Sequence, residues 1–384
     1  MRYRDSIFAS LLKPLSRRGM RSIVERHDGD AYDKSFDSWN HLVALIFAQF
    51  SACDSLRGLV ASWNAHAHHH YHLGCGPLVR STLSDANARR PTQVFAETFA
   101  MLSAQADRSL RREGMQVLRL LDATPIPLDQ LCGWADWNGR TRGLKLHVVY
   151  DPAPDHPRRI ELTPSTVNDV QVGRAQPIEN GATYVFDKAY CDYRWWAQLH
   201  AAGCHFVTRP KANAVYQVVG RRAVHLQADG FKVLDDDEVM LATQGRTKLD
   251  ITMRRLRIER DDGSTLILIS NDLQRPAAEL AALYKARWQI ELLFRWIKQH
   301  LKLRKFLGHS ENAVRLQIMA AMIAYLLLRI AARQNRIALP AIRFVQLVCD
   351  CLFVRKPIAR IDKPPQCTPA KPPGVPAQLQ FCYA

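Results

Sequence analysis

The sequence is poor in acidic residues relative to basic ones. Its 384 residues include 36 Asp and Glu against 53 Lys and Arg, which gives a formal charge of +17. A surplus of this size favours a polyanionic partner, and nucleic acid is the one we expect. An anionic membrane surface is the rival, but the sequence shows no amphipathic basic helix, lipidation signal or secretory leader. No membrane partner is therefore predicted.

Long apolar runs and regular cysteine spacing are also missing. The longest uncharged apolar stretch, Leu316 to Leu328, is shorter than the roughly 20 residues that span a bilayer, so it predicts a buried helix. Nine cysteines at scattered spacings argue against a secreted disulfide framework, and the chain is predicted to be intracellular. Cys349 and Cys351 are too close together for a usual zinc half-site, so we expect them to be packing residues.

A histidine-rich tract runs from His66 to His72. Such a tract could hold a transition metal or approach phosphate when it is protonated. No cysteine or acidic residue with ligand spacing accompanies it. We therefore predict a surface loop between two helices.

The segment around Glu291 places one acid among cations and aromatics at helical spacing. Tyr284, Arg287, Arg295 and Lys298 stand at offsets of −7, −4, +4 and +7 from Glu291, which predicts one helical stripe. The opposite stripe is apolar and can face a core; it consists of Ile290, Leu293, Ile297 and Leu301. By itself, an acid among bases is more often a solvated face with ion pairs.

Two aspartates upstream strengthen a functional interpretation. Asp122 and Asp187 each end a short apolar run that predicts a buried strand, and a strand end is where a side chain can reach a cleft. Either aspartate alone is typical of a turn or a helix cap. Together with Glu291 they offer the hard oxygen ligands that suit Mg²⁺ or Mn²⁺ in two-metal phosphoryl transfer.

This combination resembles the transposases of bacterial insertion sequences, specifically the insertion-sequence-four family of the DDE class. The family signature of Tyr, two residues, Arg, three residues, Glu, six residues and Lys is met by Tyr284, Arg287, Glu291 and Lys298. The segments around both aspartates and much of the N-terminal part also look like their family counterparts. One departure is Ala189, where many relatives carry Gly.

The resemblance implies a catalytic role and a metal requirement. Asp122, Asp187 and Glu291 would be the catalytic residues and the ligands of two Mg²⁺ or Mn²⁺ ions. Arg287 and Lys298 would bind DNA phosphates, and Tyr284 would contact a phosphate or stack on a base or sugar. In relatives with this signature a base flips out while a hairpin forms at the transposon end. Trp288 and Trp296 adjoin the acid, and the offset of Trp296 favours the core.

The resemblance also implies partners and a location. Double-stranded DNA is expected, both the terminal inverted repeats and the target, with a homodimer in the DNA complex. The location would be the bacterial cytoplasm, at the nucleoid. Two alternatives stay open: an RNase H-like DNA nuclease without strand transfer, and a catalytically silent DNA-binding repressor.

The predicted fold class is α/β, with an RNase H-like mixed sheet flanked by helices. A switch from helical to strand-like patterns near residue 115 and a run of short strands further on divide the chain. Five regions are predicted: a helical N-terminal DNA-binding domain (1–112), the first part of the catalytic core (113–209), a β-rich insertion (210–270), the last part of the core with the glutamate helix (271–355), and a Pro-rich flexible tail (356–384).

Phosphate contacts in the N-terminal domain are predicted from its summed basicity, although any single cation is more often just solubilising. The segment from Ser81 to Asn87 is expected to form a helix-entry loop. The cations and polar residues proposed for DNA contact are Arg2, Arg4, Lys13, Arg17, Arg18, Arg21, Arg80, Arg89, Arg90, Ser84 and Asn87.

Overall fold

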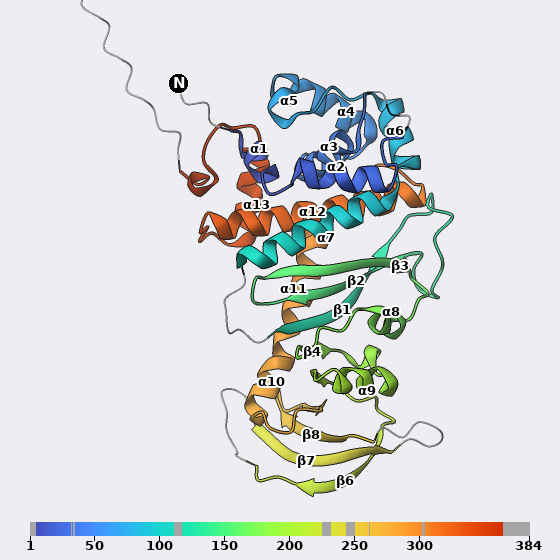
Figure 1. The fold of residues 1–384 in the computed structure, drawn as a ribbon, viewed down its shortest axis with the longest axis vertical. Coiled ribbons are helices and arrows are strands. Elements are labelled where there is room, and N and C mark those ends of the chain that lie inside the picture. The colour runs from blue at the N-terminus through green and yellow to red at the C-terminus, as the bar shows by residue number, and fades with distance from the viewer. Residues whose placement is uncertain are drawn as a thin grey trace, which may run out of the picture.

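The computed structural model describes residues 5–31, 33, 35–110, 117–224, 232–242, 250–260, 262–301, 303 and 305–363. Figure 1 shows a tall molecule with helices at one end and a sheet that runs from the middle to the other end. Arg2, Arg4, Lys302, Arg304 and the predicted tail from residue 364 onward lie outside the described residues.

The N-terminal region is helical, as predicted. Side-chain oxygens of Ser6, Ser16, Asp37 and Ser55 accept hydrogen bonds from backbone N–H groups in the first turns of their helices, which fixes where these helices begin. The helices are α1 (Ile7–Leu12), α2 (Arg17–Arg26), α3 (Ser38–Phe50), α4 (Leu56–Ala65), α5 (Ala67–Leu73), α6 (Arg80–Arg89) and α7 (Thr92–Leu110).

Two local predictions in this region are wrong. The histidine tract forms α5, and His69 and His70 are buried rather than exposed in a loop. The His70 ring stacks on Trp63, and the His69 ring stacks on Phe353, so contacts with distant aromatics stabilise the helix. The segment Ser81 to Asn87, expected to be a loop, lies inside α6.

One nine-stranded sheet forms the rest of the molecule, in the order β3-β2-β1-β4-β5-β9-β8-β7-β6. The first three strands are antiparallel neighbours, and β4 and β5 run parallel to β1. This arrangement is the RNase H-like fold predicted from the order of elements. Its strands are β1 (Leu118–Pro127), β2 (Gly143–Asp151), β3 (His156–Pro164), β4 (Thr183–Phe186) and β5 (His205–Thr208).

The predicted run of short strands after residue 209 continues the same sheet. The antiparallel pair β5–β9 joins it to the RNase H-like strands. Cross-strand ion pairs hold its centre, among them Arg254 with Asp236 at 2.5 Å and Arg255 with Asp237. The strands are β6 (Val215–Arg221), β7 (Lys232–Ala242), β8 (Thr252–Glu259) and β9 (Thr265–Ser270).

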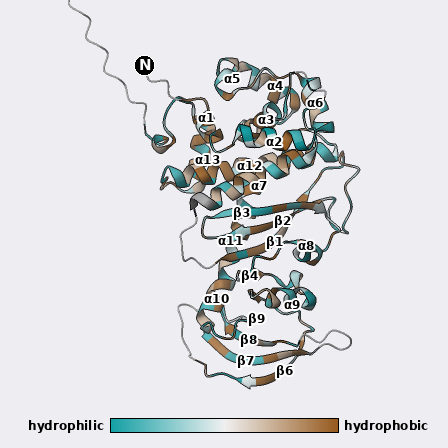
Figure 2. Cartoon of the chain, viewed as in Figure 1, coloured by the Kyte–Doolittle hydropathy of each residue, from teal (hydrophilic) through white to brown (hydrophobic). Residues whose placement is uncertain are grey.

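Helix α12 is the apolar centre of the helical end (Figure 2). It is long and apolar enough to cross a membrane, but 89% of its most apolar window is buried inside the chain. It packs against α7, α3 and β3, as a core helix does. The buried helix predicted from Leu316 to Leu328 is therefore confirmed. The remaining helices are α8 (Asp169–Ala175), η1 (Lys188–Tyr190), α9 (Tyr193–Ala201), α10 (Ala277–Ala286), α11 (Trp288–His300), α12 (Glu311–Gln334), α13 (Ala341–Asp350) and η2 (Ile358–Arg360).

The C-terminal part corrects one further expectation. Helix α11 ends at His300, and the described residues between it and α12 are not helical. Residues 356–363 are not a free tail, because Ile358 and Ile361 are buried in the main core. Cys349 and Cys351 pack against that core, as predicted.

Candidate active site

Strand register brings the two aspartates together. In the parallel pair β1–β4, Leu121 lies opposite Phe186, which is the last residue of β4. Asp122 follows Leu121 in β1, and Asp187 follows Phe186 at the end of β4. The two aspartates therefore lie side by side where β4 ends. The expectation that Asp122 ends its strand is wrong, since β1 continues to Pro127. Asp122 is nevertheless accessible because β4 stops one residue earlier.

The helix that carries Glu291 is interrupted. The sequence predicted one continuous helical stripe from Tyr284 to Lys298, but α10 ends at Ala286 and α11 begins at Trp288, with Arg287 between them. Glu291 therefore lies in the first turn of α11, where the helix dipole favours a negative charge. The apolar stripe is confirmed, and Ile290, Leu293 and Ile297 are buried. Because α11 packs against β1, its acid is held at the aspartate edge.

Arg287 is the cation that joins the acids. Its Nη1 lies 3.1 Å from Oδ2 of Asp122, and its Nη2 lies 2.5 Å from Oε1 of Glu291. Its side chain is only 17% exposed, while those of Asp122 and Glu291 are 19% and 31% exposed. Its buried Nε has no hydrogen-bond partner among the described residues. One guanidinium thus connects β1 to α11 and retains an unused donor.

Tyr284 and Lys298 lie on either side of this centre. The Tyr284 hydroxyl lies 3.5 Å from Oδ1 of Asp187, and burial raises the pKa of this phenol, so it stays a hydrogen-bond donor. Lys298 donates a 2.6 Å hydrogen bond to Oγ1 of Thr124. All six residues proposed from the sequence therefore lie around one edge of the sheet.

Thr124 was not identified from the sequence. It follows Asp122 by two residues on β1, so both side chains point to the same face of the sheet. That spacing of two was the available signal, but it becomes informative only when β1 is known to continue past Asp122.

Burial and neighbouring charge act on Asp122. Desolvation, with smaller contributions from Glu291 and Asp187, raises its pKa to about 6, although Arg287 and the backbone N–H of Ala123 oppose the shift. The carboxylate is thus costly to ionise without a further cation. The three carboxylates lie at one partly exposed edge, and Arg287 pairs with two of them. This oxygen-rich donor set fits a hard divalent cation such as Mg²⁺ or Mn²⁺.

The aromatics beside Glu291 differ in exposure. Trp288 is 50% exposed, with the Arg295 guanidinium 5.6 Å from the centre of its ring. Trp296 is only partly exposed and packs edge-on against Tyr325, as its helical offset predicted. Of these two tryptophans, Trp288 is therefore the one available to a ligand.

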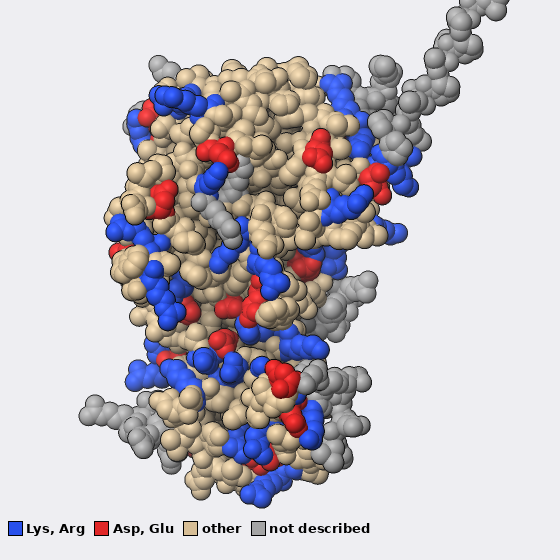
Figure 3. Space-filling view, turned by 180° about the vertical axis from the view of Figure 1, so that it is seen from behind, with Lys and Arg blue, Asp and Glu red and all other residues tan. Residues whose placement is uncertain are grey.

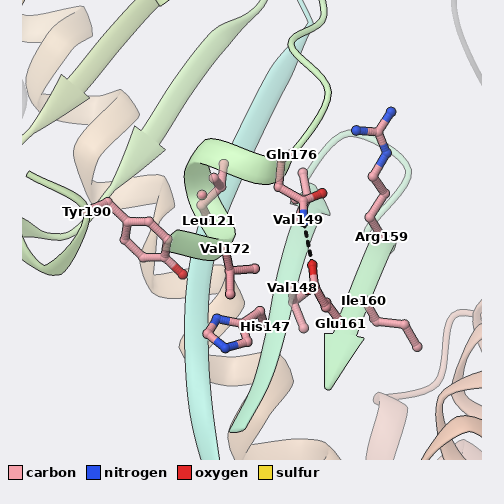
Figure 4. Close-up of a pocket in the computed structure, with 11 residues that line it drawn as sticks. Leu121, His147, Val148, Val149, Arg159, Ile160, Glu161, Val172, Gln176 and Tyr190 are labelled. Atoms are coloured by element: carbon pink, nitrogen blue, oxygen red, sulfur yellow. Dashed lines mark hydrogen bonds between the residues drawn. The ribbon is translucent and has the colours of Figure 1, made fainter. Parts of the chain in front are cut away.

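A small cavity lies between α8 and the strands β1, β2 and β3 (Figure 4). Helix α8 covers β1 and β2 there, with Leu121, His147, Val172 and Tyr190 among the lining residues. A methyl group on Gly173 would lie 2.9 Å from the Tyr190 ring, which is too close for a buried side chain. Burial raises the pKa of Tyr190, and the charges of Asp169, Asp122 and Asp187 add to the shift.

Charged side chains of both signs gather across the narrow middle of the molecule in Figure 3, at the height where Figure 1 places β4 and α10. In the N-terminal region, two residues proposed for DNA contact are instead structural. Arg90 is 3% exposed and pairs with Asp30 and Asp33. Asn87 is 4% exposed and hydrogen-bonds His41. Both side chains are buried by contacts with residues that are distant in the sequence.

Comparison with known proteins shows that most of the chain is similar to transposases. Residues 113–327 match the family model of the transposase DDE domain, and residues 3–76 match a domain of unknown function. A candidate transposase of Sinorhizobium fredii, y4zB, is 58% identical over 304 residues, which cover 78% of this chain and 85% of the relative.

More distant relatives belong to named insertion sequences. A candidate transposase of IS5377 from Geobacillus stearothermophilus is 29% identical, with coverage of 69% of this chain and 72% of the relative. A candidate transposase of IS4SA from Synechocystis is 28% identical, with coverage of 65% and 71%. A solved structure of the piggyBac transposase synaptic complex with hairpin DNA aligns at a TM-score of 0.46 and 8% identity, over 96% of this chain and 84% of that one.

The DDE domain match covers more than half of the chain. The relatives are transposases, and two of them are named for insertion sequences, in agreement with the Tyr-Arg-Glu-Lys signature. A member of this family is a divalent-metal-dependent enzyme that cleaves DNA and transfers its strands, so DNA is its partner. The chain belongs to the DDE transposase family of insertion sequences.

Proposed function

We propose that this transposase binds the ends of its insertion sequence and moves it by a cut-and-paste reaction with a hairpin intermediate. The observation that carries the proposal is that Asp122 on β1, Asp187 just after β4 and Glu291 on α11 meet at one edge of the sheet, where Arg287 pairs with Asp122 and Glu291. An ordinary surface ion-pair network would leave no excess of acids facing an accessible edge.

Asp122, Asp187 and Glu291 are proposed to hold two Mg²⁺ ions. Bound metal in such a site activates water or a 3′-hydroxyl and stabilises the leaving oxygen. The protein's own contribution is to hold the three carboxylates at a fixed spacing. Strand pairing fixes two of them and the packing of α11 on β1 fixes the third.

Arg287 is proposed to exchange partners during the reaction. In the structure it pairs with Asp122 and Glu291. Cations held by these carboxylates would compete with the guanidinium, which could then bind a DNA phosphate as a two-pronged donor. Its unpaired Nε provides a further donor for that contact.

Lys298 and Tyr284 are proposed to position the substrate and one acid. Thr124 holds the Lys298 ammonium on the same face of β1 as Asp122, where it can meet a phosphate next to the cut. Tyr284 is 7% exposed, so its hydroxyl is better suited to orient Asp187 than its ring is to stack on a base. A hairpin brings phosphates of two strands together, and the cations on this helix would offset their repulsion.

End recognition is proposed for the helical N-terminal region. Arg18, Arg21, Arg80 and Arg89 remain exposed there, in contrast to Arg90. We further propose action as a homodimer on DNA, without a membrane partner, in the bacterial cytoplasm.

Labelled insertion-sequence ends and a target plasmid test the proposal. Wild-type protein with Mg²⁺ should yield nicked, hairpin and resolved ends in that order on a denaturing gel, followed by integrated product. Cleavage without any integration would favour the nuclease alternative. Gel-shift binding of the ends without cleavage at any metal concentration would favour the repressor alternative. Double-strand breaks with no hairpin at any time would contradict the hairpin route.

A further inference from the structure

A second group of metal-ligating side chains lies away from the three acids. Asp129 and Cys132 belong to the loop between β1 and β2, and His309 belongs to the segment before α12. One ligand atom from each residue lies within 4.8 Å of the other two. Five residues of extended strand, about 17 Å, separate Asp122 from the end of β1, and Asp129 lies beyond that end. This group is therefore separate from the DDE site.

Backbone contacts hold the three residues in place. The indole Nε1 of Trp134 donates a 2.6 Å hydrogen bond to the His309 carbonyl, which ties the loop to the segment before α12. Arg142 donates to the carbonyl of Gly133, and the N–H of Cys132 donates to the carbonyl of Asp129, so the loop is closed on itself. Ligand residues almost 180 positions apart are thus brought together by the fold.

The donor set differs from that of the catalytic acids. It combines a thiol, an imidazole and one carboxylate, and the soft sulfur favours Zn²⁺ over Mg²⁺. Cys132 is fully buried, whereas the side chains of Asp129 and His309 are 55% and 44% exposed. Tetrahedral Zn²⁺ holds its ligand atoms about 3.5 Å apart, so a shift of about 1 Å by the two exposed side chains would complete the site.

We propose that Asp129, Cys132 and His309 bind one Zn²⁺ ion, with water as the fourth ligand. The ion links the loop after β1 to the start of α12 and so fixes the two flanks of the catalytic core to each other. Binding in the folded protein alone raises the melting temperature in proportion to the logarithm of free zinc.

Cobalt gives a direct test, because a thiolate ligand produces a charge-transfer absorption band that oxygen ligands do not. The full-length protein is stripped with a chelator and titrated with Co²⁺ and then Zn²⁺, with no DNA present. We expect one equivalent of Co²⁺ to give the thiolate band, and Zn²⁺ to abolish it by displacement. Absence of the band, or binding that is no tighter than at surface carboxylates, would overturn the proposal.

Variants separate this site from the catalytic one. Cys132→Ser should remove the band, and His309→Gln, which changes an exposed side chain, should weaken Co²⁺ binding by about a hundredfold while the protein stays folded. Cys351→Ser and Asp122→Asn serve as matched controls and should keep the band. If the band survives Cys132→Ser, or if His309→Gln binds as tightly as wild type, the assignment is wrong. Neither readout depends on DNA cleavage, so the transposase proposal stands or falls independently.

Discussion

Two clusters in this protein combine arginine and acidic side chains, and the two clusters have different roles. Arg119 is 1% exposed and contacts Asp151 at 2.5 Å and Glu179 at 2.8 Å. Arg158 pairs with Glu179 and also with Asp107, so each of the three acids in this network contacts a guanidinium. Arg287 contacts Asp122 and Glu291 and has a buried Nε without a hydrogen-bond partner among the described residues, while Asp187 is contacted by the Tyr284 hydroxyl.

The difference lies in how the acids are paired. In the Arg119 cluster every acid contacts a guanidinium, and the cluster joins β1, β2, β3, α7 and the segment before β4. Such a network is costly to disrupt, because removing one partner leaves an uncompensated charge. In the Arg287 cluster, Asp187 forms no ion pair among the described residues and is met by the Tyr284 hydroxyl, so one carboxylate remains for a bound cation. Incomplete neutralisation, rather than the mere presence of ion pairs, distinguishes the candidate site.

The largest expected effect is on catalysis. Asp122→Asn should reduce cleavage by about a thousandfold or more, roughly 4 kcal/mol of transition-state stabilisation, because the carboxylate is a proposed metal ligand. The fold should be as stable as wild type or more so at neutral pH, since ionised Asp122 is partly desolvated. Cleavage and thermal unfolding measured on one preparation test both statements, and near-wild-type cleavage would remove Asp122 from the metal site.

The matched change in the neutralised cluster should act on stability instead. Arg119→Met should lower the free energy of unfolding by about 3 kcal/mol, because Asp151 and Glu179 lose their buried partner. Arg159→Met is the control: among the described residues this neighbouring arginine forms no ion pair and donates a hydrogen bond to the Pro177 carbonyl at the surface, so its loss should have a much smaller effect. Equal stability of both variants in urea unfolding would show that the Arg119 network is dispensable.

Arg287→Gln should reduce hairpin formation by about a hundredfold, the usual effect of losing one donor that stabilises transition-state charge. First-strand nicking should suffer less, because it brings fewer phosphates together, so nicked product should accumulate. Arg295→Gln is the matched control on the same helix, where the cation contacts only the Trp288 ring among the interactions described. If nicking and hairpin formation fall equally, Arg287 serves the site as a whole.

The smallest expected effect is that of pH on metal affinity. Burial raises the pKa of Asp122 to about 6, so below that pH a proton must leave before a cation can bind. The Mg²⁺ concentration for half-maximal cleavage should rise about tenfold for each pH unit below 6. The free energy of unfolding changes with pH in the opposite sense. The Asp122 carboxyl binds a proton more tightly in the folded protein than in the unfolded chain, so the contribution of Asp122 to stability decreases as pH rises from about 4 to 6. A flat metal requirement between pH 7 and 5 would contradict the shift.

Local sequence patterns determined much of this protein. Spacing alone predicted which residues of α11 face the core, and apolar runs predicted β1, β4 and the buried helix α12. The signature spacing also selected Tyr284, Arg287, Glu291 and Lys298. The predictions of helices and strands held because side-chain periodicity follows directly from helix and strand geometry.

Strand ends, helix breaks and the partners of individual side chains depended on tertiary contacts, which side-chain periodicity does not predict. Whether Asp122 ends a strand depends on where β4 stops, and the break at Arg287 places one guanidinium between two acids. Distant partners also made Arg90 a buried structural residue and turned the histidine tract into a helix. In each case a contact between residues far apart in the chain outweighed the local preference. The sequence by itself named the acids and the cations of the signature, and only the three-dimensional pairing of strands and helices decided which of them meet.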